Sequence, residues 1–140
     1  MIEDDFKYLH ILIIDDEAFM RKLIERTLSD IGVGIVSQAS NGREGLSLLQ
    51  SAKSKVDLVV CDLEMPEMNG FDFVKQVRSS SDERLDSTVP ILILTGHADE
   101  ETVRGAANLG INGYLIKPIS RKSLEGRILK SIKTPAMKNN

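Results

Sequence analysis

The sequence predicts one α/β domain built around a parallel β-sheet. Short apolar runs of strand length alternate, along 140 residues, with segments whose apolar residues recur at the 3.6-residue spacing of a helix. Strands that alternate with helices form parallel sheets with right-handed crossovers. Polar side chains directly follow four of the apolar runs, and ligands of open parallel sheets bind outside the carboxyl ends of the strands. The same pattern therefore predicts both the fold and the place of a site.

Five strands are expected, each an apolar run bounded by polar or turn residues. The run at 56–61 is the clearest, because five of its six residues are non-polar and its valines are β-branched. The run at 35–39 is the weakest. The expected strands are residues 11–14, 35–39, 56–61, 91–94 and 113–116.

A helix is expected after each strand. The first keeps helical spacing from Met20 to Ile31 and ends at Gly32, and the last begins after Ser120, a favourable N-cap. The other three are marked by apolar residues at 46–49 and 71–77 and by the segment 99–109.

Length and composition favour a single cytoplasmic domain. The net charge of −3 gives no overall basic character that would indicate a nucleic-acid partner, and Cys61 alone cannot form an internal disulfide. No run approaches the roughly 18 apolar residues of a membrane helix, and the N-terminus has no signal-peptide pattern. We therefore expect no membrane insertion. The expected limits are an N-terminal extension at 1–10, the domain at 11–133 and a flexible tail at 134–140.

The charge is unevenly distributed along the chain. Residues 117–140 carry seven basic residues and one acidic residue, a balance of +6, against −9 for the rest. This basic end is either a solvated helix and tail or a docking surface for an acidic partner.

Polar groups from four strand ends are expected to converge in one crevice. Asp15 and Asp16 follow the first strand, and Asp62 follows the third. Clustered carboxylates bind hard cations such as Mg²⁺. Thr95 and Lys117 follow the fourth and fifth strands, and their hydroxyl and ammonium groups suit a phosphoryl group.

These segments resemble the receiver domain of two-component response regulators, of the single-domain chemotaxis type. The similar stretches, spread from about residue 11 to about residue 120, are LIIDDEAFMRKLI, VVCDLEMPEMNGFDF, PILILTG and GINGYLIKP. The resemblance implies a flavodoxin-like, doubly wound (βα)5 fold with strand order 2-1-3-4-5. That order places the first and third strands side by side, which would bring Asp15, Asp16 and Asp62 together.

The resemblance also implies a role for each acidic residue. Asp62 would be the phosphoacceptor, and a phosphohistidine on a sensor histidine kinase or a histidine phosphotransfer protein would be the donor. Mg²⁺ would be held by Asp15, Asp16, Asp62 and the backbone carbonyl of Glu64. Beyond accepting and losing its own phosphoryl group, the protein would not be an enzyme.

Residues of the last two strands would sense and transmit the phosphoryl group. Lys117, followed by Pro118 across a cis bond in this family, would contact the phosphoryl oxygens. Thr95 would donate its hydroxyl to one of them, and Gly96 would leave room for it. Tyr114 corresponds to the aromatic residue whose inward position follows the switch hydroxyl.

Two further expectations concern signal lifetime and output. Glu64 and His97 flank the acceptor, at positions that commonly tune the lifetime of the phosphorylated state. Output would leave through the face formed by helix 99–109, strand 113–116 and the last helix, toward an effector protein. Asn112 and Gly113 stand where dimerising members often carry an acid pair, so we expect a monomer.

Other interpretations remain open on the sequence. One is a receiver-like scaffold that works without phosphorylation. A phosphatase of the haloacid dehalogenase kind also uses an aspartate nucleophile, but it needs Asp-x-Asp after the first strand. A flavodoxin-like flavin protein is disfavoured, because Asp15 and Asp16 would repel the flavin phosphate.

Overall fold

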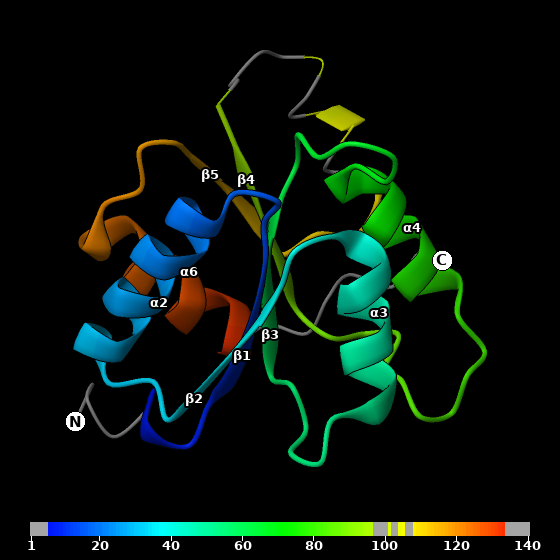
Figure 1. The fold of residues 1–140 in the computed structure, drawn as a ribbon, viewed down its shortest axis with the longest axis horizontal. Helices are drawn as coiled ribbons and strands as arrows, with labels where there is room; N and C mark the ends of the chain where they lie inside the picture. Colours follow the sequence, from blue (N-terminus) through cyan, green and yellow to red (C-terminus); the bar gives the residue numbers. More distant parts are fainter. Residues whose placement is uncertain (1–5, 97–100, 102–103, 106–107, 134–140) are drawn as a thin grey trace.

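A five-stranded parallel sheet forms the centre of the protein (Figure 1). The computed structural model describes residues 6–96, 101, 104–105 and 108–133. The strand order is β2-β1-β3-β4-β5, as the resemblance implied. The strands are β1 (His10–Ile14), β2 (Ile35–Ala39), β3 (Leu58–Asp62), β4 (Ile91–Thr95) and β5 (Gly113–Ile116).

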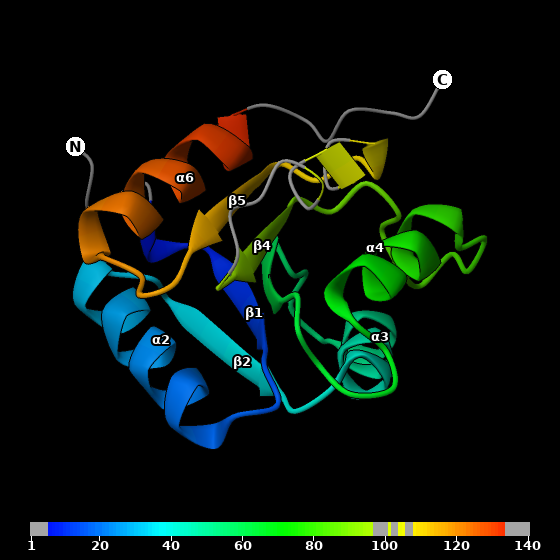
Figure 2. The same ribbon diagram turned by 90° about the horizontal axis from the view of Figure 1, so that it is seen from above.

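Helices cover both faces of the sheet, so the fold is doubly wound. Figure 2 shows α2 and α6 on one face and α3 and α4 on the other. The four helices with described bounds are α2 (Ala18–Ile31), α3 (Gly42–Ser51), α4 (Gly70–Ser79) and α6 (Arg121–Lys133). The helix expected at 99–109 lies largely outside the described residues.

Local signals set the helix ends. Asn69 accepts a hydrogen bond from the backbone of Asp72, whose side chain accepts one in return, and this capping box starts α4. Gly32 ends α2 with a φ of 109°, a left-handed conformation that glycine adopts without a steric penalty. Ser120 caps α6 as expected, because its hydroxyl oxygen accepts from the Ser123 amide at 3.1 Å.

The sheet is buried on both sides between two apolar clusters. All residues of β1, β3 and β4 are buried, which explains why these strands read as nearly continuous apolar runs. β2 lies at one edge and is only partly buried, which accounts for its weak sequence signal. The central strands therefore hold their carboxyl ends in fixed positions.

The segment before β1 contributes to the core. Phe6 is fully buried in the cluster on the α2 and α6 face. β1 begins at His10, one residue earlier than expected. The fold thus draws on residues that the sequence analysis placed in the N-terminal extension.

Candidate functional site

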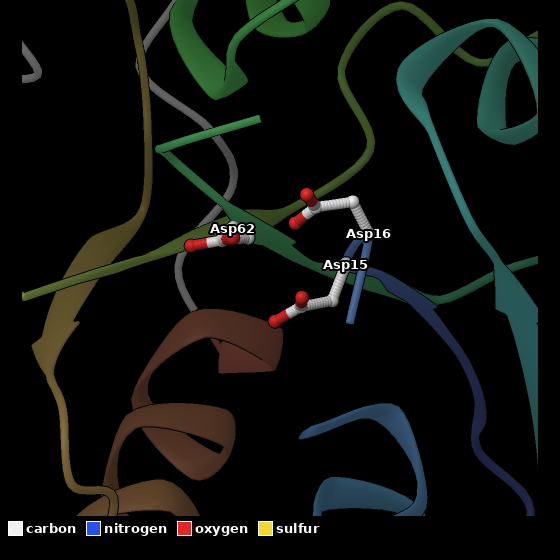
Figure 3. A group of neighbouring side chains, drawn as sticks. All are labelled: Asp15, Asp16 and Asp62. Carbon is white, nitrogen blue, oxygen red and sulfur yellow. The ribbon is translucent and has the colours of Figure 1, made fainter. Parts of the chain in front are cut away.

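Three carboxylates meet at the carboxyl ends of β1 and β3 (Figure 3). The two strands pair directly, with Ile14 opposite Cys61, so the residues that follow them are neighbours. Oxygen atoms of Asp15, Asp16 and Asp62 all lie within 4.8 Å of one another. The expected acidic cluster is therefore formed.

Asp15 is fully buried, and only one of its two carboxylate oxygens accepts a hydrogen bond from the described residues. Its Oδ1 accepts a hydrogen bond from the Glu17 amide at 2.9 Å. Among the described residues, its Oδ2 is the buried side-chain atom without a hydrogen-bond partner, and it lies 3.7 Å from Lys117 Nζ. Burial raises the pKa of Asp15, against the opposing effects of the Glu17 hydrogen bond and the Lys117 charge.

Asp62 is almost completely buried and forms an ion pair with Lys117. Asp62 is the last residue of β3 and only 1 % exposed, and Lys117 Nζ donates to its Oδ1 at 2.9 Å. Burial raises the pKa of Asp62 to about 6, although the Lys117 hydrogen bond opposes the rise. Burial lowers the pKa of Lys117, but the contact with Asp62 outweighs it and the net shift is upward. The bond from Lys117 to Pro118 is cis, as the resemblance implied.

The cluster fits a divalent cation of the Mg²⁺ kind. Buried Asp15 Oδ2, which has no hydrogen-bond partner among the described residues, is the kind of acceptor that a cation satisfies, and two more carboxylates lie within reach. Asp16 is exposed, so one side of the site is open to water. Mg²⁺ usually takes one or two carboxylates, keeps several waters and accepts phosphate oxygens.

Thr95 closes the neighbouring strand end, where it contacts Glu64. Thr95 is the last residue of β4 and 1 % exposed. Its hydroxyl donates to Glu64 Oε1 at 3.0 Å. The backbone of Lys117 donates to the Thr95 carbonyl at 2.8 Å, which ties the end of β5 to the same place. The sequence analysis did not foresee the contact between Thr95 and Glu64.

Of the remaining predicted positions, Gly96 and Tyr114 are among the described residues. A Cβ placed on Gly96 would meet no atom of the described, non-adjacent residues within 4 Å, so none of these fills the space beside it. Tyr114 is half-buried and packs against the cluster on the α3 and α4 face. His97 lies outside the described residues.

Arg21 is a site residue that the sequence analysis missed. Its guanidinium, on the first turn of α2, donates to the Asp15 carbonyl at 2.7 Å and so holds the turn between β1 and α2. Basic residues are common on exposed helix faces, so composition and spacing alone do not distinguish this arginine from its neighbours.

Comparison with known proteins places the chain in a family. The family model for the response regulator receiver domain matches residues 11–129. Chemotaxis protein CheY-3 of Vibrio cholerae is 36 % identical over 122 residues, which cover 87 % of this chain and 90 % of that protein. Chemotaxis protein CheY of Pseudomonas aeruginosa is 37 % identical, with coverage of 87 % and 94 %. The chain belongs to the response regulator receiver family, in its CheY-like branch of signalling proteins.

Solved structures share the fold. Chemotaxis protein CheY4 of Vibrio cholerae superposes with a TM-score of 0.76 at 33 % identity, covering 88 % of this chain and 98 % of that chain. The receiver domain of the histidine kinase CKI1 of Arabidopsis thaliana, in complex with Mg²⁺ and BeF₃⁻, has a TM-score of 0.81 at 24 % identity, covering 94 % and 95 %. Within the described part of the chain, no helix is long and apolar enough to cross a membrane.

Proposed function

We propose that this protein is a cytoplasmic phosphoacceptor of a two-component system, which takes a phosphoryl group on Asp62 and then changes the surface it offers to an effector. The observation that carries the proposal is the buried pair of Asp62 and Lys117 beside Asp15 Oδ2, which lies 3.7 Å from Lys117 Nζ and has no hydrogen-bond partner among the described residues. A sensor histidine kinase or a histidine phosphotransfer protein would supply the phosphohistidine. The family assignment disfavours the phosphatase and flavin-protein alternatives.

The chemistry is an in-line transfer to a carboxylate. An Asp62 oxygen forms a bond to phosphorus while the phosphorus–nitrogen bond to the donor breaks and the imidazole leaves with the electron pair. Such transfers depend on positioning and charge stabilisation more than on base strength. Lys117, already 2.9 Å from Asp62, offsets negative charge on the transferred group. Bound through Asp15, Asp16, Asp62 and the Glu64 carbonyl, Mg²⁺ would neutralise charge on the phosphoryl oxygens.

The switch consists of Thr95, at the end of β4, and Tyr114, within β5. Thr95 would turn its hydroxyl to a phosphoryl oxygen, and the lack of a side chain on Gly96 favours entry of the group. Tyr114, opposite Ile93 in the sheet, would follow Thr95 inward. These movements alter the surface around β5 and α6.

A basic groove on that surface favours an acidic effector segment. The groove has a volume of about 600 Å³ and lies between β5 and α6. Its lining includes Tyr114 and the three basic residues Lys122, Arg127 and Lys130. The helix expected at 99–109, which the sequence analysis assigned to the same output face, lies largely outside the described residues. We expect one subunit per particle, and a sedimentation mass of a dimer with beryllofluoride present would contradict this.

Acetyl phosphate labelling tests the proposal. With Mg²⁺ present, wild-type protein should gain one labile phosphoryl group by intact-mass measurement, and Asp62→Asn should gain none. Omission of Mg²⁺ should suppress the gain. A wild-type protein that gains no mass would contradict the proposal and favour the phosphorylation-independent scaffold.

A further inference from the structure

The Thr95 hydroxyl has one proton to donate, and it uses this proton in the hydrogen bond to Glu64. The hydroxyl donates to Glu64 Oε1 at 3.0 Å. A threonine hydroxyl carries a single O–H donor, so it can serve one acceptor at a time. An oxygen of a phosphoryl group on Asp62 would therefore have to displace Glu64 from Thr95.

We propose that Glu64 is a positioning residue that holds the Thr95 hydroxyl while the protein is unphosphorylated. Its carboxylate takes the place of the phosphoryl oxygen that would otherwise accept the Thr95 hydrogen bond. The inference rests on the proposed function of Asp62 as phosphoacceptor. It assigns Glu64 a task distinct from the lifetime of the phosphorylated state, because the contact acts before any phosphoryl group arrives.

Leu63, the residue before Glu64, is held by backbone hydrogen bonds, which keeps the Glu64 side chain within reach of Thr95. The Leu63 amide donates to the Leu94 carbonyl at 2.8 Å, which fastens the start of the loop to β4. The Gly70 amide donates to the Leu63 carbonyl at 2.9 Å. A Cβ on Gly70 would lie 2.7 Å from the Asp62 carbonyl oxygen, so the loop closes tightly on itself. Exchange of acceptors is therefore a side-chain rotation of Glu64.

Burial and charge favour the replacement of Glu64 by a phosphoryl oxygen once Asp62 carries the group. Thr95 is 1 % exposed and stays at the strand end, whereas Glu64 is exposed and can turn its carboxylate into water without a desolvation cost. The pKa of Asp62 is raised chiefly by burial, and the charges of Asp15 and Glu64 add to the rise, so the Glu64 carboxylate lies in electrostatic range of the acceptor. A phosphoryl group on Asp62 adds negative charge there and repels Glu64.

Binding of beryllofluoride, which with Mg²⁺ imitates a phosphoryl group on Asp62, measures the competition. Glu64→Ala removes the carboxylate that accepts from the Thr95 hydroxyl and should tighten binding about fivefold, the size of one net hydrogen bond. Glu64→Gln should give a smaller gain, because the amide oxygen still accepts but carries no charge. Glu67→Gln is the matched control, since it removes an exposed carboxylate from the same loop, and it should leave the affinity unchanged.

A double-mutant cycle with Thr95→Val separates competition from simple repulsion. Valine keeps the shape of threonine and loses the hydroxyl, so in this background Glu64→Ala should yield less than half of its wild-type gain. An equal gain in both backgrounds means that Glu64 acts only through its charge, which overturns the inference. No gain from Glu64→Ala overturns it as well. Failure of wild-type protein to bind beryllofluoride would instead count against the proposed function.

Nuclear magnetic resonance of the free protein gives a second measure that does not depend on the Thr95 variant. In Glu64→Ala without beryllofluoride, the Thr95 methyl signal should move toward its position in wild-type protein bound to Mg²⁺ and beryllofluoride. Glu67→Gln should leave the signal in place. A Thr95 methyl signal that does not move toward that position in Glu64→Ala overturns the inference.

Discussion

The two ends of the parallel sheet bury polar groups in opposite ways. At the amino end, His10 is 6 % exposed and both ring nitrogens are engaged, Nδ1 with the Ser54 carbonyl at 3.0 Å and Nε2 with the Ser37 hydroxyl at 2.7 Å. Since a carbonyl only accepts, Nδ1 carries the proton. The Asp57 carboxylate accepts from the His10 amide at 2.9 Å.

At the carboxyl end, buried polar groups are left partly unsatisfied. Asp15 Oδ2 has no hydrogen-bond partner among the described residues, and the pKa values of both Asp15 and Asp62 are raised, chiefly by burial. One lysine faces these two buried carboxylates. Polar groups buried for structure are saturated within the chain, whereas those at the carboxyl end retain capacity for a ligand.

The largest expected effect is a loss of stability as pH rises. Burial raises the pKa of Asp62 from 3.8 to about 6, so between these values the native state holds the proton more tightly than the unfolded chain. The contribution of protonated Asp62 to the free energy of unfolding is therefore complete below the unfolded-state pKa of 3.8. It is lost as the pH rises to the native-state pKa of about 6, by about 3 kcal/mol in total. Urea unfolding of metal-free protein from about pH 4 to about pH 7 measures the slope.

Asp62→Asn is the control for that slope. The variant removes the titrating group, so it should lose most of the pH dependence and be more stable than wild type near neutral pH. If the variant keeps the wild-type slope, Asp15, whose pKa burial also raises, carries the titration instead.

The next effect is at the amino end, where the polar groups are satisfied. His10→Ala should lower the free energy of unfolding by about 2 kcal/mol, because it removes a buried ring together with both of its hydrogen bonds. Tyr8→Ala is a nearby comparison, since Tyr8 is 82 % exposed, and it should change stability little. Equal losses in the two variants, measured by denaturant unfolding, would contradict the role given to the His10 network.

Mg²⁺ should stabilise the protein through the carboxyl end alone. At ten times its dissociation constant, a cation that binds only the native state adds about 1.4 kcal/mol to the free energy of unfolding. Asp15→Asn and Asp62→Asn should each reduce this gain, and His10→Ala should not. A gain that survives both aspartate substitutions would place the cation elsewhere. Thermal unfolding with and without Mg²⁺ is the measurement.

The smallest effect concerns the lifetime of the phosphorylated state. Glu64→Asn should speed loss of the phosphoryl group roughly fivefold, which corresponds to lowering the barrier by about 1 kcal/mol. The reason is that the Glu64 side chain, which is longer than that of asparagine, obstructs the approach of water to the phosphoryl group. His97→Ala should change the rate less. Decay of phosphorylated protein after removal of the donor gives the rates. Unchanged or slower decay in Glu64→Asn would indicate that Glu64 orders the attacking water instead of excluding it.

Much of this architecture follows from local signals. Apolar runs predicted all five strands, and the caps at Gly32 and Ser120 are where the sequence placed them. Strand limits shifted by one or two residues: Asp62 and Thr95 are the last residues of β3 and β4 rather than the residues that follow them. The end of a strand depends on where its backbone stops pairing with the neighbouring strands. A polar residue can extend the strand when its backbone N–H and C=O groups find partners there.

The sequence by itself determined the residue types at the strand ends, and hence the acidic cluster with Lys117 and Thr95, because side chains at the carboxyl ends of buried strands have little freedom of place. Only the tertiary structure decided which partners those side chains meet. Arg21 at the Asp15 carbonyl, Phe6 in the core and Glu64 at the Thr95 hydroxyl join groups from separate elements. Such contacts depend on how segments distant in the sequence pack together, and local periodicity and spacing carry no information about that packing.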